Sequence, residues 1–166
     1  MASFDHSRAA GPRPPTGPAG RSEATADPPG GSNGNVVPVT TTSTLSVDCG
    51  GGGIKASVLD AEGAIVSRAV RTPTPYPLPP TKLVETIAGL AEQLPRADRV
   101  TVGMPGMIRH GVVIATPHYI TRDGPRSRVL PELVEQWARF DMGGAVSTRL
   151  AIPALVLNDA EVAGCG

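Results

Sequence analysis

Over most of the chain, short apolar runs alternate with polar turns, a pattern typical of an α/β domain. Strands are predicted at residues 44–48, 54–60 and 64–71, and Glu62-Gly63 supplies a turn between the last two. Since these strands follow one another closely, we expect an antiparallel meander. Residues 72–80 are rich in proline and predict an extended connector.

Two amphipathic helices are predicted after the connector. The first has apolar residues spaced three and four apart on one face: Leu83, Val84, Ile87, Leu90, Ala91 and Leu94. Thr81 is its expected N-cap, and Pro95 is expected to stop it. The second helix has Pro131 near its first turn. Its apolar face is formed by Leu130, Leu133, Val134 and Trp137, so we expect the tryptophan to pack in the core.

Further strands are predicted between and after these helices. Residues 99–103 and 154–157 are short apolar runs that favour buried strands. A hairpin is predicted with strands at 107–109 and 112–115. Its turn, His110-Gly111, places a histidine where it is expected to be solvated.

The two ends of the chain differ from the middle. Residues 1–43 contain seven prolines and six glycines and almost no clustered apolar residues. Such a segment cannot bury enough surface to offset its chain entropy, so we expect a disordered tail, with docking on a partner as the alternative. Residues 160–166 are predicted to begin another helix.

The charge balance and the cysteines exclude several classes of function. The chain has 15 basic and 15 acidic residues, so nothing in its net charge favours binding to nucleic acid or to an anionic membrane. No apolar run reaches the length of a membrane span, and the amino terminus lacks the apolar segment of a secretory signal. Cys49 and Cys165 fit no disulfide framework or metal spacing, which favours a cytoplasmic protein. Cys49 is expected to be a small buried residue.

Candidate chemistry begins with the run Asp48-Cys49-Gly50-Gly51-Gly52-Gly53-Ile54-Lys55 between two predicted strands. Four successive glycines cost conformational entropy, which is reasonable where backbone amides must approach a ligand closely. Phosphate is the usual ligand of such a turn, and the flanking carboxylate and lysine suit a metal–phosphate group. The alternative is a flexible hairpin connection.

Two further turns follow predicted strands, Gly103–Gly106 and Asn158-Asp159. In open α/β sheets, ligands bind at the carboxyl ends of strands, so the three turns are expected to share one cleft. Asp159 would be well placed as a general base, because a strand and a helix fix its position. The alternative is that Asp159 is only a helix N-cap and Asn158 a turn residue.

Together these motifs resemble the ROK sugar kinases of the actin-like/hexokinase ATPase superfamily, which include glucokinases and polyphosphate glucokinases. The motifs are DCGGGGIK at 48–55, GMPGMIRHGVV at 103–113 and LNDAEVAG at 157–164, in the family's order. The resemblance implies an actin-like/RNase H-like lobe over residues 44–166, with a mixed sheet flanked by helices.

The resemblance also implies roles for residues. Asp48 would organise Mg²⁺ through water, and Gly50, Gly51, Gly52 and Gly53 would wrap the transferring phosphate. Lys55 would either contact phosphate or end a strand in solvent. Gly103, Pro105 and Gly106 would form a wall of the sugar pocket, and Asn158 would hydrogen-bond sugar hydroxyls. Asp159 would take the proton from the attacking hydroxyl.

The implied activity is phosphoryl transfer from ATP or polyphosphate to a hexose, such as glucose to glucose 6-phosphate, with Mg²⁺. Full-length relatives are expected to be homodimers. The family's second lobe, with its zinc-binding Cys/His cluster, has no counterpart here, so we expect an amino-terminal fragment without a zinc site. The alternative is therefore an inactive lobe that at most binds sugar weakly. The family's repressors are a third alternative, which the neutral tail disfavours.

The chain departs from the family's pattern at two places. Relatives usually carry Thr or Ser at the position of Gly52, and often an Asn where this chain reads Ala115-Thr116-Pro117-His118. His118 is expected to be a loop residue, with substrate contact as the alternative. Arg122, Arg126 and Arg128 lie in the polar loop 116–128, where a solvated surface is favoured over an anion-binding patch.

Overall fold

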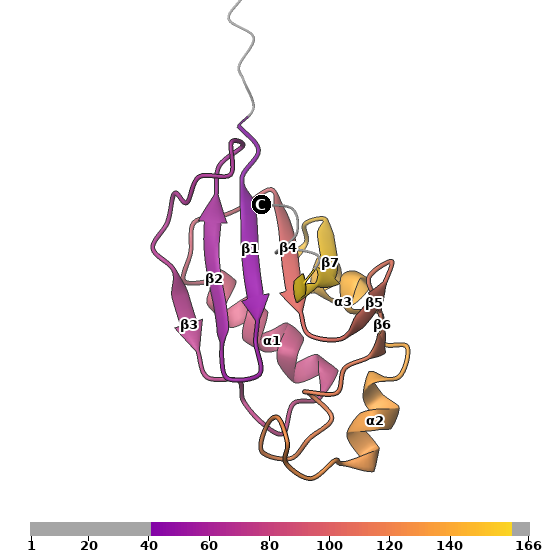
Figure 1. The fold of residues 1–166 in the computed structure, drawn as a ribbon. Helices are drawn as coiled ribbons and strands as arrows, with labels where there is room; N and C mark the ends of the chain where they lie inside the picture. Colours follow the sequence, from indigo (N-terminus) through magenta and orange to yellow (C-terminus); the bar gives the residue numbers. More distant parts are fainter. Residues whose placement is uncertain (1–40, 161–166) are drawn as a thin grey trace, which may run out of the picture. The chain divides into compact units, whose positions relative to one another are not determined.

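The computed structural model describes residues 41–160. Five strands form one sheet in the order β3-β2-β1-β4-β7 (Figure 1). Their bounds are β1 Thr44–Cys49, β2 Ile54–Leu59, β3 Val70–Thr72, β4 Arg99–Met104 and β7 Ala154–Asn158. The predicted tail at 1–43 lies almost entirely outside the described residues, as does nearly all of the helix predicted for 160–166.

The sheet is mixed, as predicted. β2 pairs antiparallel with both β1 and β3, which confirms the expected meander. β4 lies parallel to β1 on one side and to β7 on the other. Because β7 is an edge strand, the prediction of a buried strand there is only partly right: Val156 is buried and Leu155 is 53% exposed.

The third strand is much shorter than predicted, beginning at Val70 instead of residue 64. Before it, the chain touches the sheet through an isolated bridge between Leu59 and Ile65. The Ser67 hydroxyl accepts the Val58 N–H at 2.8 Å, so a side chain takes the place of a backbone partner of β2. This contact ends the ladder early and leaves Ile65 exposed.

Three helices accompany the sheet: α1 Pro80–Ala91, α2 Pro131–Trp137 and α3 Met142–Leu150. The prediction of Thr81 as N-cap of α1 is wrong, since Pro79 caps the helix and Pro80 occupies its first position. Proline suits that position because it has no N–H to leave unpaired. α1 ends at Ala91, before Pro95.

α3 was not predicted from the sequence. Its cap is clear, because an Asp141 carboxylate oxygen accepts the Gly144 N–H at 2.8 Å. Two glycines in its first turn weaken the helical pattern, although Met142 and Val146 are buried one turn apart. α1 and α3 pack against each other, and Figure 1 shows α1 behind the sheet.

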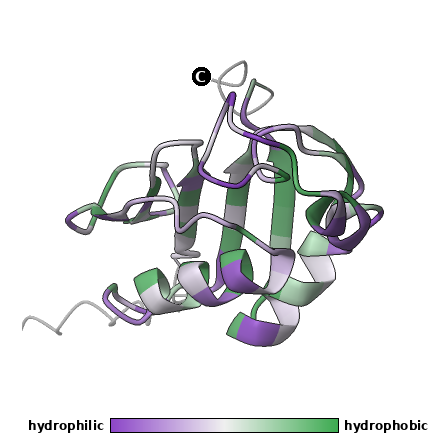
Figure 2. Cartoon of the chain, turned by 90° about the horizontal axis from the view of Figure 1, so that it is seen from below, coloured by the Kyte–Doolittle hydropathy of each residue, from purple (hydrophilic) through white to green (hydrophobic). Residues whose placement is uncertain are grey.

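The core lies between the sheet and these helices. Alternate strand residues point into it, including Leu45, Val47 and Cys49 of β1, and the strands carry green stretches beside paler ones in Figure 2. Trp137 is buried as predicted, and its indole N–H donates to the Leu78 carbonyl at 2.8 Å. Val134, expected on the same apolar face, is 42% exposed.

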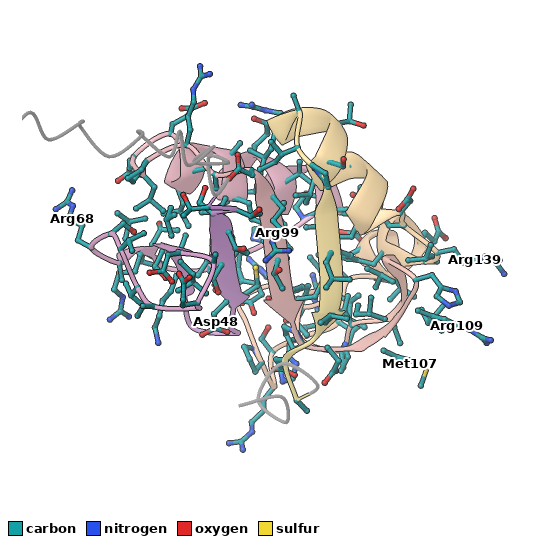
Figure 3. All side chains as sticks on the ribbon, turned by 90° about the horizontal axis from the view of Figure 1, so that it is seen from above. Asp48, Arg68, Arg99, Met107, Arg109 and Arg139 are labelled. Atoms are coloured by element: carbon teal, nitrogen blue, oxygen red, sulfur yellow. The ribbon has the colours of Figure 1, made fainter. Side chains whose placement is uncertain are left out.

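The predicted hairpin is present as β5 Met107–Arg109 and β6 Val112–Ala115. His110 is exposed in its turn with φ 50°, as expected for a solvated turn residue. Figure 3 shows Met107 and Arg109 pointing outward on this side of the domain. The longest described helix, α1, has 12 residues, and no helix in the described range has the length and hydropathy that a membrane span requires.

Candidate active site

The carboxyl ends of β1, β4 and β7 lie at one edge of the sheet, because the three strands are parallel neighbours. Asp48 is the register partner of Gly103, and Met104 is the partner of Asn158. The loop from β1 to β2 turns at this same edge (Figure 1). The fold therefore brings together the three turns singled out in the sequence.

The glycine turn between β1 and β2 is held by segments distant in sequence. Its own closure is a hydrogen bond from Gly50 N–H to the Gly53 carbonyl at 2.9 Å. The Thr74 hydroxyl donates to the Gly50 carbonyl at 2.7 Å. The Tyr119 hydroxyl donates to the Cys49 carbonyl, also at 2.7 Å. These two side chains fix the carbonyls of the turn and so fix where its amides lie.

The amides that follow in the turn are unused by residues 41–160. Among the described residues, no acceptor is found for the N–H groups of Gly51, Gly52 and Gly53. Gly52 is exposed, and a Cβ placed on it would meet no atom within 4 Å. A Cβ on Gly51 would lie 2.8 Å from Pro125, so the loop after β6 closes over that side. Consecutive free amides in an anchored turn form an anion-binding concavity.

Charged residues flank the turn on one row of the sheet. Asp48 and Lys55 are register partners on β1 and β2, and both are exposed. Within residues 41–160 they form no ion pair with each other. The carboxylate and the ammonium group are thus both open to a ligand at the mouth of the turn.

The second turn, Gly103–Gly106, is closed and tightly packed. Gly106 has φ 136°, and a Cβ on it would collide with the carbonyl oxygen of Ala115. The Thr116 hydroxyl donates to the Pro105 carbonyl at 2.9 Å. Beside the turn is an open hollow of about 540 Å³. Its lining residues are Gly106, Met107, Ile108, Ala115, Pro117 and Asn158.

The third turn carries the amide and carboxylate proposed for sugar recognition and catalysis. The Asn158 side-chain amide donates to the Gly106 carbonyl, and its Oδ1 accepts the Ala160 N–H at 2.8 Å. Asp159 also accepts the Ala160 N–H through Oδ1, at 2.9 Å. The contact typical of an N-cap, to the N–H two residues on, is made by Asn158, whereas Asp159 contacts only the N–H of the next residue. That contact occupies one oxygen, and the side chain remains exposed.

Tyr119 contacts the glycine turn, and the charges of both Asp48 and Asp159 affect its pKa. Burial raises the pKa of its phenol, and the neighbouring groups Cys49, Tyr76, Asp159 and Asp48 raise it further. Burial, with the charge of Asp48, also raises the pKa of the Cys49 thiol. Cys49 is fully buried, which confirms the expectation of a small buried residue.

Sequence reasoning missed the residues that hold the turns. No sequence pattern indicates the roles of Thr74, Thr116 and Tyr119, because each becomes buried only when its loop folds back onto the sheet. His118 is half-buried, and its ring lies near Gly51. The loop arginines at 122, 126 and 128 are exposed, as expected for a solvated loop, and Arg122 has only a 3.9 Å contact with Asp123.

The sequence matches the profile of the ROK family over residues 44–166. The chain belongs to the ROK family. An N-acetylmannosamine kinase from Escherichia fergusonii is 29% identical over 124 residues, 72% of this chain and 37% of that protein. The ROK assignment inferred from the three motifs is thus confirmed.

Solved structures give the same picture. The polyphosphate/ATP-glucomannokinase of Arthrobacter sp. strain KM matches with a TM-score of 0.59 and 30% identity, over 74% of this chain and 46% of that one. A ROK glucokinase from Streptomyces griseus, solved with glucose and AMPPNP, matches with a TM-score of 0.55 and 26% identity, over 74% and 35%. The predicted fold class is confirmed, and the chain spans less than half the length of each of these relatives.

Proposed function

We propose that this ROK protein contributes the acceptor side and the first phosphate turn of a hexose kinase. The observation that supports it best is the meeting of three turns at one sheet edge, one with free amides and one with an exposed carboxylate. The relatives named above are sugar kinases, with glucose, mannose or N-acetylmannosamine in their names. The reaction is transfer of a phosphoryl group from ATP or polyphosphate to a sugar hydroxyl.

Asp159 is the proposed general base. Its Oδ1 is held by the Ala160 N–H, which orients the carboxylate and leaves the other oxygen for the sugar hydroxyl. Asn158, tied to Gly106, is proposed to orient the sugar. The neighbouring hollow beside Gly106 supplies room for the ring of a hexose. The proton of the attacking hydroxyl passes to Asp159 as that oxygen bonds to phosphorus, while the bond from phosphorus to the donor's bridging oxygen breaks and releases ADP or a polyphosphate one unit shorter.

The amides of Gly51, Gly52 and Gly53 are proposed to bind the oxygens of the transferring phosphoryl group. Phosphoryl transfer depends chiefly on alignment and on neutralising charge, which an anchored turn of free amides supplies. Thr74 and Tyr119 keep the turn in shape through its carbonyls.

Mg²⁺ fits the side chains at this edge. No group of three or more His, Cys, Asp or Glu side chains that suits a metal occurs within the described range. Mg²⁺ does not need one, because it keeps several waters and binds through one or two carboxylates together with substrate phosphates. Asp48, exposed at the end of β1, would hold it through water. When bound, the ion would neutralise phosphate charge.

A second candidate is a lobe that binds sugar weakly without turnover. The chain covers only 35–46% of the solved relatives, and a kinase cleft needs both of its walls. This partial coverage supports the second candidate. Sugar-dependent consumption of ATP or polyphosphate by residues 1–166 alone would exclude this candidate.

The test is a kinase assay on the protein expressed from its gene through to the stop codon. Glucose, mannose and N-acetylmannosamine are each offered with ATP and with polyphosphate. Asp159→Asn is expected to lower kcat by about 10²–10⁴-fold with little change in KM, because it removes the base and keeps the shape. Asp123→Asn, an exposed loop carboxylate, is the matched control. Wild-type turnover in Asp159→Asn would show that the base is elsewhere.

A further inference from the structure

A second cation lies beside Lys55 at the corner of the sheet. Arg71 of β3 is the register partner of Lys55, so both side chains leave the same face of the sheet on adjacent strands. The guanidinium also reaches the glycine turn. Its Nη2 lies 3.8 Å from the position that a Cβ would take on Gly53. Because Gly53 has no side chain, this cation can lie against the turn.

Neither cation is used by the described part of the protein. Two arginines elsewhere do have partners: Arg99 donates to the Thr44 hydroxyl, and Arg149 pairs with Glu85 and Glu92. The side chains of Lys55 and Arg71 have no hydrogen bond or ion pair to residues 41–160, and both are exposed. Asp48 is the carboxylate on the same row, so the corner keeps an excess of positive charge beside three free amides.

We propose that Lys55 and Arg71 form a second phosphate subsite, which binds a linear inorganic polyphosphate chain running from the glycine turn across β2 and β3. This inference rests on the proposed function and names its phosphoryl donor. One phosphate group occupies the amides of Gly51–Gly53, and the next groups of the chain lie against the two cations. A guanidinium recognises phosphate oxygens in a fork, which gives the subsite direction as well as charge.

The surroundings favour a phosphate chain over a nucleoside. β3 is the edge strand, so an extended anion can continue past Arg71 without meeting another strand. Ser57, two residues after Lys55 on β2, is also polar. Within the described range Tyr119 and Trp137 are buried and Tyr76 and Phe140 are half-buried, so no aromatic ring is fully exposed for stacking a base.

The experiment measures binding of inorganic tripolyphosphate, orthophosphate and ATP to the 1–166 protein by calorimetry, with amide shifts of Gly51–Gly53 as the local readout. We expect tripolyphosphate to bind more tightly than orthophosphate or ATP. Arg71→Ala is expected to weaken tripolyphosphate about tenfold and to leave orthophosphate nearly unchanged. Lys55→Ala, a second variant on another strand, is expected to act in the same direction.

Arg68→Ala is the matched control, because it removes the same charge nearby. Figure 3 shows Arg68 on the outer side of the domain, apart from Asp48. Equal losses for Arg68→Ala and Arg71→Ala would overturn the subsite, as would the absence of tripolyphosphate binding. ATP binding as tightly as tripolyphosphate, with the same loss in Arg71→Ala, would overturn the choice of donor. Asp159→Asn is expected to keep full tripolyphosphate binding, so failure of the subsite and failure of the proposed kinase are distinguishable.

Discussion

Two glycine turns lie at the same edge of the sheet and use glycine for opposite purposes. In the β1–β2 turn, Gly52 is exposed with no atom within 4 Å of an added Cβ, and the amides of Gly51–Gly53 have no acceptor among the described residues. In the β4–β5 turn, Gly106 has φ 136° and fits tightly against Ala115 and Thr116. The first turn leaves space for a ligand, and the second lets two backbone segments touch.

The two turns differ in which of their backbone groups already have partners within the protein. The carbonyls of the second turn are taken by protein side chains, Thr116 on Pro105 and Asn158 on Gly106. In the first turn the Cys49 and Gly50 carbonyls are also taken, by Tyr119 and Thr74, while the amides of Gly51–Gly53 have no acceptor within residues 41–160. Glycines alone therefore do not indicate a phosphate site. A glycine-rich turn is a candidate only when its backbone N–H groups lack acceptors in the protein.

The largest effect is expected from Gly106→Ala. A methyl group there collides with the Ala115 carbonyl, and a non-glycine residue is strained at this φ, so we expect a loss of about 3 kcal/mol or more, or no folded protein. Gly89→Ala in α1 is the control, since nothing lies within 4 Å, and we expect a gain of about 0.5–1 kcal/mol. Urea unfolding measures both. A stable Gly106→Ala protein would remove the contrast between the turns.

A smaller effect is expected from Tyr119→Phe. The change leaves the buried Cys49 carbonyl without its hydrogen bond, which costs about 1–3 kcal/mol and loosens the glycine turn. Tyr76→Phe is the matched control, because that hydroxyl is buried without a partner and its removal is expected to be neutral or stabilising. Hydrogen exchange at Gly50–Gly53 tests the local loosening. Equal exchange in both variants would mean that Tyr119 does not hold the turn.

The same hydroxyl predicts a loss of stability in alkali. Burial raises the pKa of Tyr119 and of Tyr76 in the folded protein, so their protonated forms stabilise it. That stability is complete below the unfolded tyrosine pKa of about 10 and is lost progressively as the pH rises above it. Melting temperatures between pH 8 and 11 are expected to fall less in Tyr119→Phe than in wild type. A parallel fall in both proteins would assign the effect to other groups.

The smallest effect on stability is expected from Gly52→Ser, which adds the hydroxyl that the ROK motif leads us to expect at this position. The space around Gly52 predicts a change within about 0.5 kcal/mol. Tighter tripolyphosphate binding is expected, because the hydroxyl adds a donor beside the free amides. Gly51→Ser is the counterpart: its Cβ meets Pro125 at 2.8 Å, so it is expected to destabilise the protein. Similar stabilities for the two variants would contradict the account of the turn.

Local pattern was enough to predict the meander, the hairpin and the order of the three turns. It failed where long-range contacts decide the outcome. Ser67 takes a donor of β2 and shortens β3, which no periodicity reports. α3 was missed because its glycines weaken a helix that Asp141 nevertheless caps.

Some residues of the candidate site could be predicted from sequence motifs, and others depend on long-range contacts. Asp48, the glycines and Asn158-Asp159 are consecutive motifs, so their positions at strand ends followed from the sequence. Arg71 was not singled out, because its place beside Lys55 depends on the register of β2 and β3. Tyr119 likewise depends on a contact 70 residues away along the chain.

The strand order also determines when the cleft forms as the chain leaves the ribosome. β1, β2 and β3 emerge together and pair locally, so the phosphate turn forms from neighbouring segments. β4 joins β1 about 55 residues later, and β7 is the last strand of the sheet to be synthesised. Asn158, which ties the Gly106 carbonyl, arrives only with β7. A nascent chain thus completes the glycine turn first and the Asn158–Gly106 contact last, so in the proposed kinase the phosphate turn forms before the sugar-binding turn.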